Sequence, residues 1–367
     1  MTGPELILHW GYPGEGHALQ TDDGYVLTMF RVPRGRSRGG DKQPSELAAG
    51  PRPVVFLQHG LFQTADQWLM RGPGEDLAFI LADLGFDVWM GNFRGSTYSR
   101  KHVRLSPQKR KFWDFGWQEN ALYDLPAMLD YVSAVTEQES MFYVGHSMGT
   151  TTILGLLAAR PEYNRRVRAA FLMAPVAYFQ HTWGALAAAK STAGSLANAR
   201  LIGELFPRGS GDACKNVLPL CISLYNSAGG YSPREFNMAL FQILVGHFPS
   251  GASYGQLTHY LQMMVTGEFK MCDYGAKENL ARYGQPKPPP FRLSNVVAPV
   301  FLHVSEGDAF SPIKDQKRLA SEIPGFRKMI KVPLRDFGHT DHLYAIHTYQ
   351  LEYKQIISIM LDMLRSQ

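Results

Sequence analysis

Short runs of apolar residues recur along this chain, and each run leads directly into a tight turn or loop. Longer stretches with apolar residues at helical spacing, such as residues 121–135, lie between the runs. The five clearest runs are residues 54–57, 87–90, 141–144, 170–173 and 299–304. This alternation predicts an α/β protein whose central sheet is mostly parallel, with helices on both faces.

The alternation breaks between residues 180 and 290. This stretch holds two helical fragments, residues 186–202 and 235–245, and it closes with four prolines among residues 285–290. A single inserted segment of this length is more typical of a lid than of a linker. We therefore predict one large domain with a core of residues 1–179 and 291–367, while residues 180–290 form a helical cap or lid.

The composition is that of a globular enzyme, since 45% of the residues are hydrophobic and 19% are charged. Much of the formal net charge of +5 lies in one polar stretch, residues 34–52, which we interpret as a solvated surface loop. A nucleic-acid partner would need a basic face with aromatic platforms, so we expect none. No apolar run approaches the length of a membrane span, and no signal peptide is visible in this chain.

The sharpest motif is Gly145-His146-Ser147-Met148-Gly149, which follows an apolar run and precedes a predicted helix. A serine between glycines in such a strand-to-helix turn has strained backbone geometry, and the small flanking residues avoid clashes. The turn aims the hydroxyl out of the sheet, where the dipole of the following helix favours negative charge. The motif predicts that Ser147 is the nucleophile of an α/β-hydrolase fold.

A serine nucleophile needs a base and an orienting acid, and in this fold the chain order is serine, acid, histidine. Asp308 comes just after the last long apolar run, and His339 follows a short predicted strand. We predict that Asp308 orients His339 and that His339 is the base for Ser147. Asp315 and Asp336 are alternative acids, and His342 is an alternative base.

The oxyanion of the tetrahedral intermediate needs two backbone N–H donors. One should be the amide of Met148, the residue after the nucleophile. The second should come from a loop that follows an early strand, and in His59-Gly60-Leu61 the amide of Leu61 is the natural candidate. Each such donor is typically worth about 3 kcal/mol of transition-state stabilisation.

Other chemistries lack their motifs. No H-E-x-x-H pattern accompanies the closely spaced histidines, and no Walker loop or Rossmann glycine motif is present, so we expect no metal and no cofactor. The three cysteines leave two alternatives open: Cys214 and Cys221 pair in an oxidising compartment, or all three, including Cys272, stay reduced.

Together these motifs resemble the acid lipase family of α/β hydrolases, the group of gastric and lysosomal acid lipases and their invertebrate relatives. The resemblance covers nearly the whole chain. Its segments are residues 10–13, 23–27, 59–61, 77–83, 87–95, 145–149, 174–177, 249–253, 273–275 and the terminal helix over residues 349–363. This chain departs from the family in two places. Met148 stands where the family usually has glutamine, and His339-Thr340-Asp341-His342 stands where the family has His-Leu-Asp-Phe.

The resemblance implies Ser147 as nucleophile, Asp308 as acid and His339 as base, with the oxyanion amides at Leu61 and Met148. It also implies a disulfide between Cys214 and Cys221, with a shorter spacing than in the family, and a destination that is secreted or in the lysosomal lumen.

The function that we predict is that of a serine carboxylic ester hydrolase, a lipase that cleaves acyl esters of neutral lipids such as triacylglycerols or cholesteryl esters. Its partner would be a lipid ester at a lipid–water interface. One alternative is an esterase for small or specialised esters. An alternative from another class is a catalytically silent protein that binds or stores lipid.

Overall fold

The computed structural model describes residues 1–36, 51–197, 201–207, 214, 217, 222–223, 229–230 and 232–366. Within these residues, a nine-stranded sheet has the order β1-β2-β4-β3-β6-β7-β10-β11, and β5 pairs with β2. The strands are β1 Glu15–Gln20, β2 Tyr25–Val32, β3 Val54–Gln58, β4 Asp87–Gly91, β5 Lys101–His102, β6 Met141–His146, β7 Val167–Met173, β10 Val300–Val304 and β11 Phe326–Lys331. From β4 to β11 all neighbours are parallel, while β1, β2 and β5 add an antiparallel edge. The predicted, mostly parallel sheet is confirmed.

The five apolar runs are the strands β3, β4, β6, β7 and β10. Every residue of β3 is buried, and successive side chains enter different hydrophobic clusters: Val54 and Phe56 pack on one face, Val55 and Leu57 on the other. A parallel strand that is covered on both faces needs apolar residues at every position, which is why these runs are continuous and do not alternate with polar residues.

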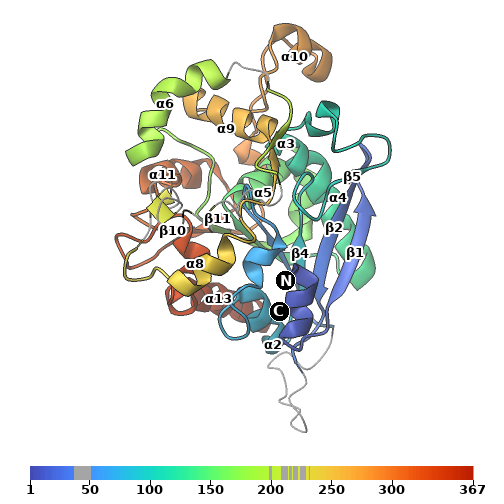
Figure 1. Cartoon of the computed structure of the whole chain (residues 1–367), viewed down its shortest axis with the longest axis vertical. Coiled ribbons are helices and arrows are strands. Elements are labelled where there is room, and N and C mark those ends of the chain that lie inside the picture. The colour runs from blue at the N-terminus through green and yellow to red at the C-terminus, as the bar shows by residue number, and fades with distance from the viewer. Residues whose placement is uncertain are drawn as a thin grey trace.

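Helices cover both faces of the sheet, as predicted (Figure 1). One face packs against α4 Leu125–Thr136, α5 Met148–Ala159, α9 Tyr254–Thr266 and α11 Ile313–Glu322. The other face packs against α1 Gly3–His9, α2 Leu77–Leu84, α8 Met238–Leu244 and α13 Lys354–Arg365. Nearly all of α5 is buried, so the helix that follows the G-x-S-x-G motif lies inside the molecule.

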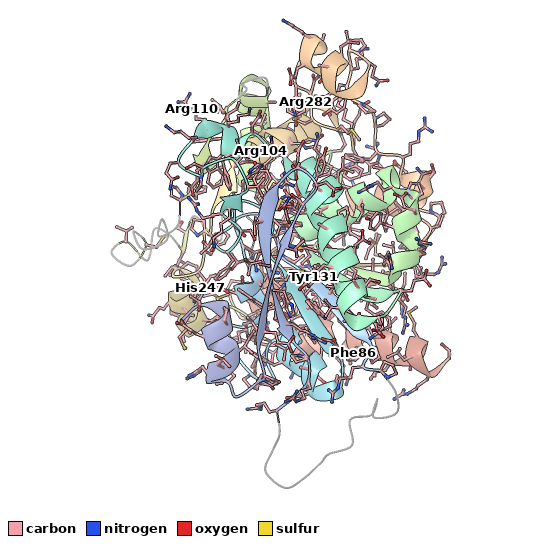
Figure 2. The ribbon with its side chains drawn as sticks, turned by 90° about the vertical axis from the view of Figure 1, so that its right-hand side faces the viewer. Phe86, Arg104, Arg110, Tyr131, His247 and Arg282 are labelled. Atoms are coloured by element: carbon pink, nitrogen blue, oxygen red, sulfur yellow. The ribbon has the colours of Figure 1, made fainter. Side chains whose placement is uncertain are left out.

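Two predicted helices begin with a wider turn. The crossover helix starts as the π-helical segment η3 Asn120–Asp124 before α4, and the terminal helix starts as η7 Tyr349–Tyr353 before α13. Figure 2 shows α4 beside the antiparallel edge of the sheet, where the Tyr131 hydroxyl lies 3.2 Å from Nδ1 of His17. The shorter helical turns are η1 Ala65–Trp68, η2 Arg110–Trp113, α3 Trp117–Glu119, η4 Pro161–Arg166, η6 Leu293–Asn295 and α12 Asp341–Tyr344.

Residues 180–290 contribute helices and a small two-stranded sheet. The elements are α6 Gly184–Ala197, β8 Glu204–Leu205, α8, β9 Ala252–Ser253, α9 and α10 Ala276–Tyr283. In Figure 1, α6, α9 and α10 lie at the end of the molecule opposite α2.

Both helical fragments predicted in this segment were too long. The first does not extend to residue 202, because the backbone leaves the helix to pair β8 with β9. The second starts at Met238, because the side chain of Asn237 accepts a hydrogen bond from the Leu240 amide and caps the helix.

Two expectations fall partly outside the described residues. Residues 37–50, which are most of the polar stretch, lie outside the described residues. Cys214 is disulfide-bonded and Cys272 is a free, buried thiol, but Cys221 lies outside the described residues, so its pairing stays a prediction. Among the residues that the structure describes, no helix is both long and apolar enough to cross a membrane.

Candidate active site

Ser147 occupies the turn between β6 and α5. Its φ of 53° and ψ of −116° are strained for a residue with a side chain. Both glycines of the motif are required by close approach: a Cβ on Gly145 would lie 2.8 Å from the carbonyl carbon of Gly149, and one on Gly149 would lie 2.5 Å from the carbonyl oxygen of Gln58. The pattern of small residues in the sequence therefore has a direct steric cause.

His339 lies between Ser147 and Asp308. Its Nε2 is 2.8 Å from Oγ of Ser147, and its Nδ1 is 2.8 Å from Oδ2 of Asp308. A carboxylate can only accept, so Nδ1 carries the ring proton and Nε2 is free to accept from the serine hydroxyl. This tautomer is the one a general base needs.

The carboxylate of Asp308 is fully buried and is fixed by the loop that follows β10. Its Oδ1 accepts hydrogen bonds from the backbone amides of Phe310 and Ser311, at 2.8 and 3.0 Å. Because Oδ1 is used in this way, Oδ2 remains for His339. The Phe310 ring also packs on the His339 ring, with 4.9 Å between centroids.

The backbone around His339 is held as well. The His339 amide donates to the carbonyl of Gly229 at 3.0 Å, and Nε2 of His146 donates to the His339 carbonyl at 2.9 Å. Burial lowers the pKa of His146 well below its usual value, so this ring is neutral and can act as a single, stable donor. His146 thus fixes the loop that carries His339.

The alternative acids and the alternative base lie elsewhere. Asp315 is bound to His181, with 2.7 Å between Oδ1 and Nδ1, and Asp336 accepts a hydrogen bond from the Ser232 hydroxyl at 3.0 Å. His342 is fully buried, and its Nδ1 lies 2.6 Å from Oε2 of Glu352. None of these three residues has a hydrogen bond to Ser147 or His339 among the described residues.

The loop with the predicted Leu61 donor lies against the turn at Ser147. A Cβ on Gly60 would be only 3.0 Å from Cβ of Ser147. The Phe93 amide donates to Nε2 of His59, so Nδ1 of His59 carries the ring proton and donates to the Gly60 carbonyl at 2.7 Å. Burial lowers the pKa of His59 to about 4, which keeps this arrangement neutral near pH 7.

Met148 is the first residue of α5, so its amide has no acceptor within the helix. Its side chain is buried in the core, where Sδ lies 3.8 Å from Nε2 of Gln256 on α9. Replacing the glutamine usual in the family by methionine therefore leaves the backbone N–H available.

Sequence reasoning missed two residues that support this site. His146 is part of the motif, but nothing in the sequence indicates its bond to the His339 carbonyl. Oε1 of Gln63 accepts a hydrogen bond from the Gly60 amide at 3.1 Å, and Nε2 of Gln63 donates a hydrogen bond to the Tyr344 hydroxyl at 3.2 Å. No sequence signal marks Gln63, because its partner Tyr344 is far away along the chain.

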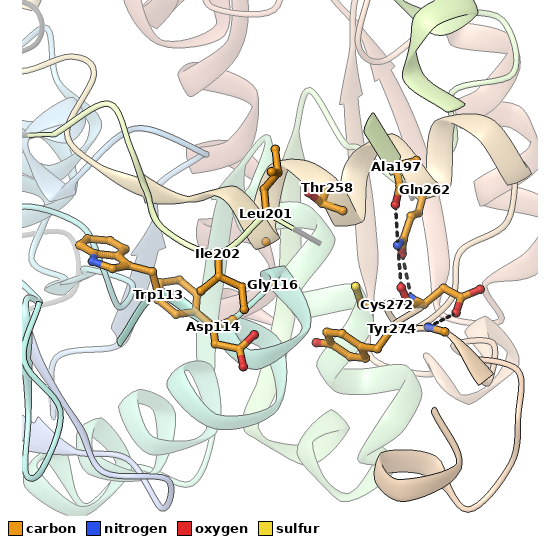
Figure 3. A pocket seen from close by; sticks show the side chains of 14 residues that line it. Trp113, Asp114, Gly116, Ala197, Leu201, Ile202, Thr258, Gln262, Cys272 and Tyr274 are labelled. Carbon is orange, nitrogen blue, oxygen red and sulfur yellow. Dashed lines mark hydrogen bonds between the residues drawn. The ribbon is translucent and has the colours of Figure 1, made fainter. Parts of the chain in front are cut away.

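A cavity of about 230 Å³ lies between α9, the end of α6 and the loop before α3 (Figure 3). Trp113, Leu201 and Tyr274 are among its lining residues. Gly255, Thr258 and Gln262 of α9 also line it, whereas Gln256 and Tyr260 on the opposite side of this helix contact α5. Because α9 separates this cavity from α5, the cavity is not part of the Ser147 site.

Comparisons with known proteins identify lipases and α/β hydrolases as relatives of this chain. Residues 4–72 match the family described as a partial α/β-hydrolase lipase region, and residues 53–195 match the α/β hydrolase fold. Lipase 1 of Drosophila melanogaster is 34% identical over 97% of this chain and 79% of its own length. Lipase member N of Mus musculus and gastric triacylglycerol lipase of Bos taurus are 33% and 32% identical, each over 99% of this chain and 91% of their own.

Solved structures share the fold at lower identity. A thermophilic esterase from Thermogutta terrifontis superposes with a TM-score of 0.52 at 15% identity, covering 96% of this chain and 98% of its own. The carboxylesterase CesB of Bacillus subtilis gives a TM-score of 0.51 at 14% identity, covering 99% and 95%. These two structures establish the α/β-hydrolase architecture only.

Proposed function

Because the chain belongs to the acid lipase family of α/β hydrolases, we propose that it is a serine carboxylic ester hydrolase that cleaves acyl esters of neutral lipids. The observation that carries the proposal is the continuous hydrogen-bond chain from the Ser147 hydroxyl through His339 to Asp308, with both links at 2.8 Å. The substrate class follows from the relatives, whose names include a gastric triacylglycerol lipase.

In the first half of the reaction, Oγ of Ser147 attacks the ester carbonyl while Nε2 of His339 takes the hydroxyl proton. Asp308 stabilises the imidazolium that forms and keeps the ring oriented. The carbonyl oxygen becomes an oxyanion, which the amides of Leu61 and Met148 stabilise. His339 then protonates the leaving alcohol, and the acyl group remains on Ser147.

In the second half, water attacks the acyl-enzyme. Nε2 of His339 removes a proton from this water, a second tetrahedral oxyanion forms, and its collapse releases the fatty acid and restores the Ser147 hydroxyl. Every proton in this cycle moves through His339.

The division into core and lid is also part of this proposal, with a core of residues 1–179 and 291–367 and a lid within residues 180–290. Two exposed aromatic side chains of the segment lie beside the site loops. The Phe206 ring is 5.2 Å from that of Phe62, the residue after Leu61, and Trp183 lines a shallow depression with Glu306 and Pro312 of the loop around Asp308. An apolar surface at this place suits contact with a lipid–water interface.

We further propose that the protein works outside the cytosol, in secretions or in the lysosomal lumen. The disulfide at Cys214 supports an oxidising compartment.

The test is a panel of substrates offered to purified wild-type protein and to Ser147→Ala. The panel runs from soluble short-chain esters to emulsified long-chain triacylglycerols and cholesteryl esters. We expect hydrolysis of emulsified long-chain esters by the wild type only. Hydrolysis restricted to short soluble esters would show that the protein is an esterase and not a lipase. No hydrolysis of any ester would contradict the enzymatic function.

A further inference from the structure

A second histidine–carboxylate pair is buried close behind the first. His342 and Glu352 are both fully buried, and Nδ1 of His342 lies 2.6 Å from Oε2 of Glu352. On its other side, Nε2 of His342 lies 3.2 Å from Oγ of Ser305. The reaction described above uses none of these three groups.

The two pairs share their supports. Ser305 and Asp308 leave the same end of β10 three residues apart, and His342 and His339 are also three residues apart. Ser305 meets His342, and Asp308 meets His339. The loop that carries His339 is therefore hydrogen-bonded at two points to the residues that follow β10. Glu352 of η7 adds a third hydrogen bond to this loop.

The buried Glu352 carboxylate depends on His342 for its hydrogen bond. Its Oε1 has no hydrogen-bond partner among the described residues, and the nearest other basic group, Nδ1 of His303, is 3.6 Å away. Burial lowers the pKa of His303 to about 4, so that ring is neutral and does not offset the charge. Burial alone would also lower the pKa of His342, but the Glu352 carboxylate raises it above its usual value.

Burying the Glu352 carboxylate lowers the stability of the fold unless its hydrogen bond to His342 compensates. A buried carboxylate needs a partner, and a packed apolar pair would fill the same space without that requirement. Directional hydrogen bonds do what apolar contacts do not: they fix the rotation of the loop, and a general base displaced by about 1 Å can lose 10²-fold in rate.

We propose that Ser305, His342 and Glu352 are positioning residues that hold the loop of His339 in register with Ser147. The proposal rests on the proposed function, because it assigns a role in the same site. His342 acts through the backbone between residues 339 and 342 and does not touch the substrate.

The test uses Ser305→Ala and Glu352→Gln, two substitutions that change shape little. kcat and KM are measured on a soluble short-chain p-nitrophenyl ester, with circular dichroism confirming that each variant is folded at the assay temperature. We expect kcat to fall about tenfold or more in both, with KM within about twofold, because a misplaced base slows chemistry and leaves ground-state binding intact. Phosphonylation of Ser147 should slow by a similar factor.

His259→Phe is the control for loss of a buried hydrogen bond elsewhere, since the fully buried His259 lies on α9, away from this loop, and is hydrogen-bonded to the Lys270 carbonyl. It should keep the wild-type kcat. Folded Ser305→Ala and Glu352→Gln variants with wild-type kcat would overturn the proposal, and if Glu352→Gln does not fold, Ser305→Ala alone decides.

Wild type and His339→Gln are assayed in parallel to separate the two hypotheses. An inactive wild type, or an active His339→Gln variant, would contradict the proposed function. An active wild type and an inactive His339→Gln variant, combined with unaffected positioning variants, would contradict the positioning role alone.

Discussion

The loops at the carboxyl end of the sheet keep Ser147, Asp308 and His339 in fixed positions, whereas the segment of residues 180–290 also presents exposed aromatic side chains beside them. Around Ser147, backbone atoms approach so closely that glycine is required, and Asp308 and His339 each take part in several hydrogen bonds. The segment reaches these loops partly through hydrogen bonds, such as the one from the His339 amide to the Gly229 carbonyl, and partly through Trp183 and Phe206, which each remain 45% exposed. We therefore expect the core to set the geometry of the chemistry and the exposed side chains of the segment to affect access of the substrate.

The segment itself is not uniform. Its helix α9 is anchored to the core, because the Tyr260 hydroxyl donates to Oγ1 of Thr151 at 2.9 Å and Nε2 of Gln256 donates to Oδ1 of Asn120 at 2.7 Å. Any part that opens should therefore end before α9.

The largest effect should come from the core. His339→Gln should lower kcat by at least about 10⁴-fold, because it removes the group that moves every proton. His342→Gln should cost far less, at most about 10²-fold, because it disturbs only position. Steady-state kinetics on a soluble ester compares the two variants. An inactive His342→Gln variant beside an active His339→Gln variant would exchange their roles.

An intermediate effect should appear in the segment and depend on the substrate. Trp183→Ser combined with Phe206→Ser should lower the rate on long-chain emulsions at least about tenfold, since full burial of an aromatic side chain in lipid is worth about 2 kcal/mol and each of these residues is 45% exposed for this contact. The rate on a soluble short ester should stay within about threefold.

Val297→Ser is the control for this prediction. Val297 is 56% exposed, but it precedes β10 and so lies at the amino end of the parallel strands, whereas the site lies at their carboxyl end. It should change neither rate. An equal loss on emulsions and soluble esters in the double variant would show that these aromatic residues support the chemistry and not the access.

The smallest effect concerns stability and tests whether α9 belongs with the core. His259 of α9 stacks on Trp117, with 4.2 Å between ring centroids, and burial lowers its pKa from 6.5 to about 3. The unfolded chain therefore binds a proton that the folded chain excludes, and stability falls as the pH drops below 6.5. Between pH 6.5 and 5 this group should cost about 2 kcal/mol.

Urea unfolding at pH 7.5, 6.5 and 5 measures this contribution. His259→Phe keeps the ring against Trp117 and should show a shallower decline of the free energy of unfolding than the wild type. Parallel declines would mean that α9 opens before the core unfolds, and α9 would then belong with the mobile part of the segment.

Much of this architecture was predictable from the sequence because it depends on local pattern. Continuous apolar runs specify strands that are buried on both faces, and the small residues around Ser147 specify the turn. The order of acid and base along the chain also pointed to Asp308 and His339, which the structure places within hydrogen-bond distance of each other. Their catalytic role stays a prediction.

What escaped prediction depends on contacts between distant parts of the chain. The helix over residues 186–202 was predicted too long, because the β8–β9 pairing that ends it involves a strand far away in sequence. The bond from Gln63 to the Tyr344 hydroxyl and the bond from His146 to the His339 carbonyl likewise join residues that are far apart in sequence. A single sequence carries no signal for such pairs.

Covalent labelling with a phosphonate tests directly whether Ser147 is the nucleophile. An alkyl phosphonate p-nitrophenyl ester is incubated with wild type and with Ser147→Ala, and the adduct is mapped by mass spectrometry of peptides. We expect one phosphonyl group per wild-type chain, on Ser147, with loss of esterase activity in proportion to labelling, and no adduct on the folded but inactive Ser147→Ala variant. An adduct on another serine, or full hydrolytic activity in Ser147→Ala, would contradict the role of Ser147 as nucleophile.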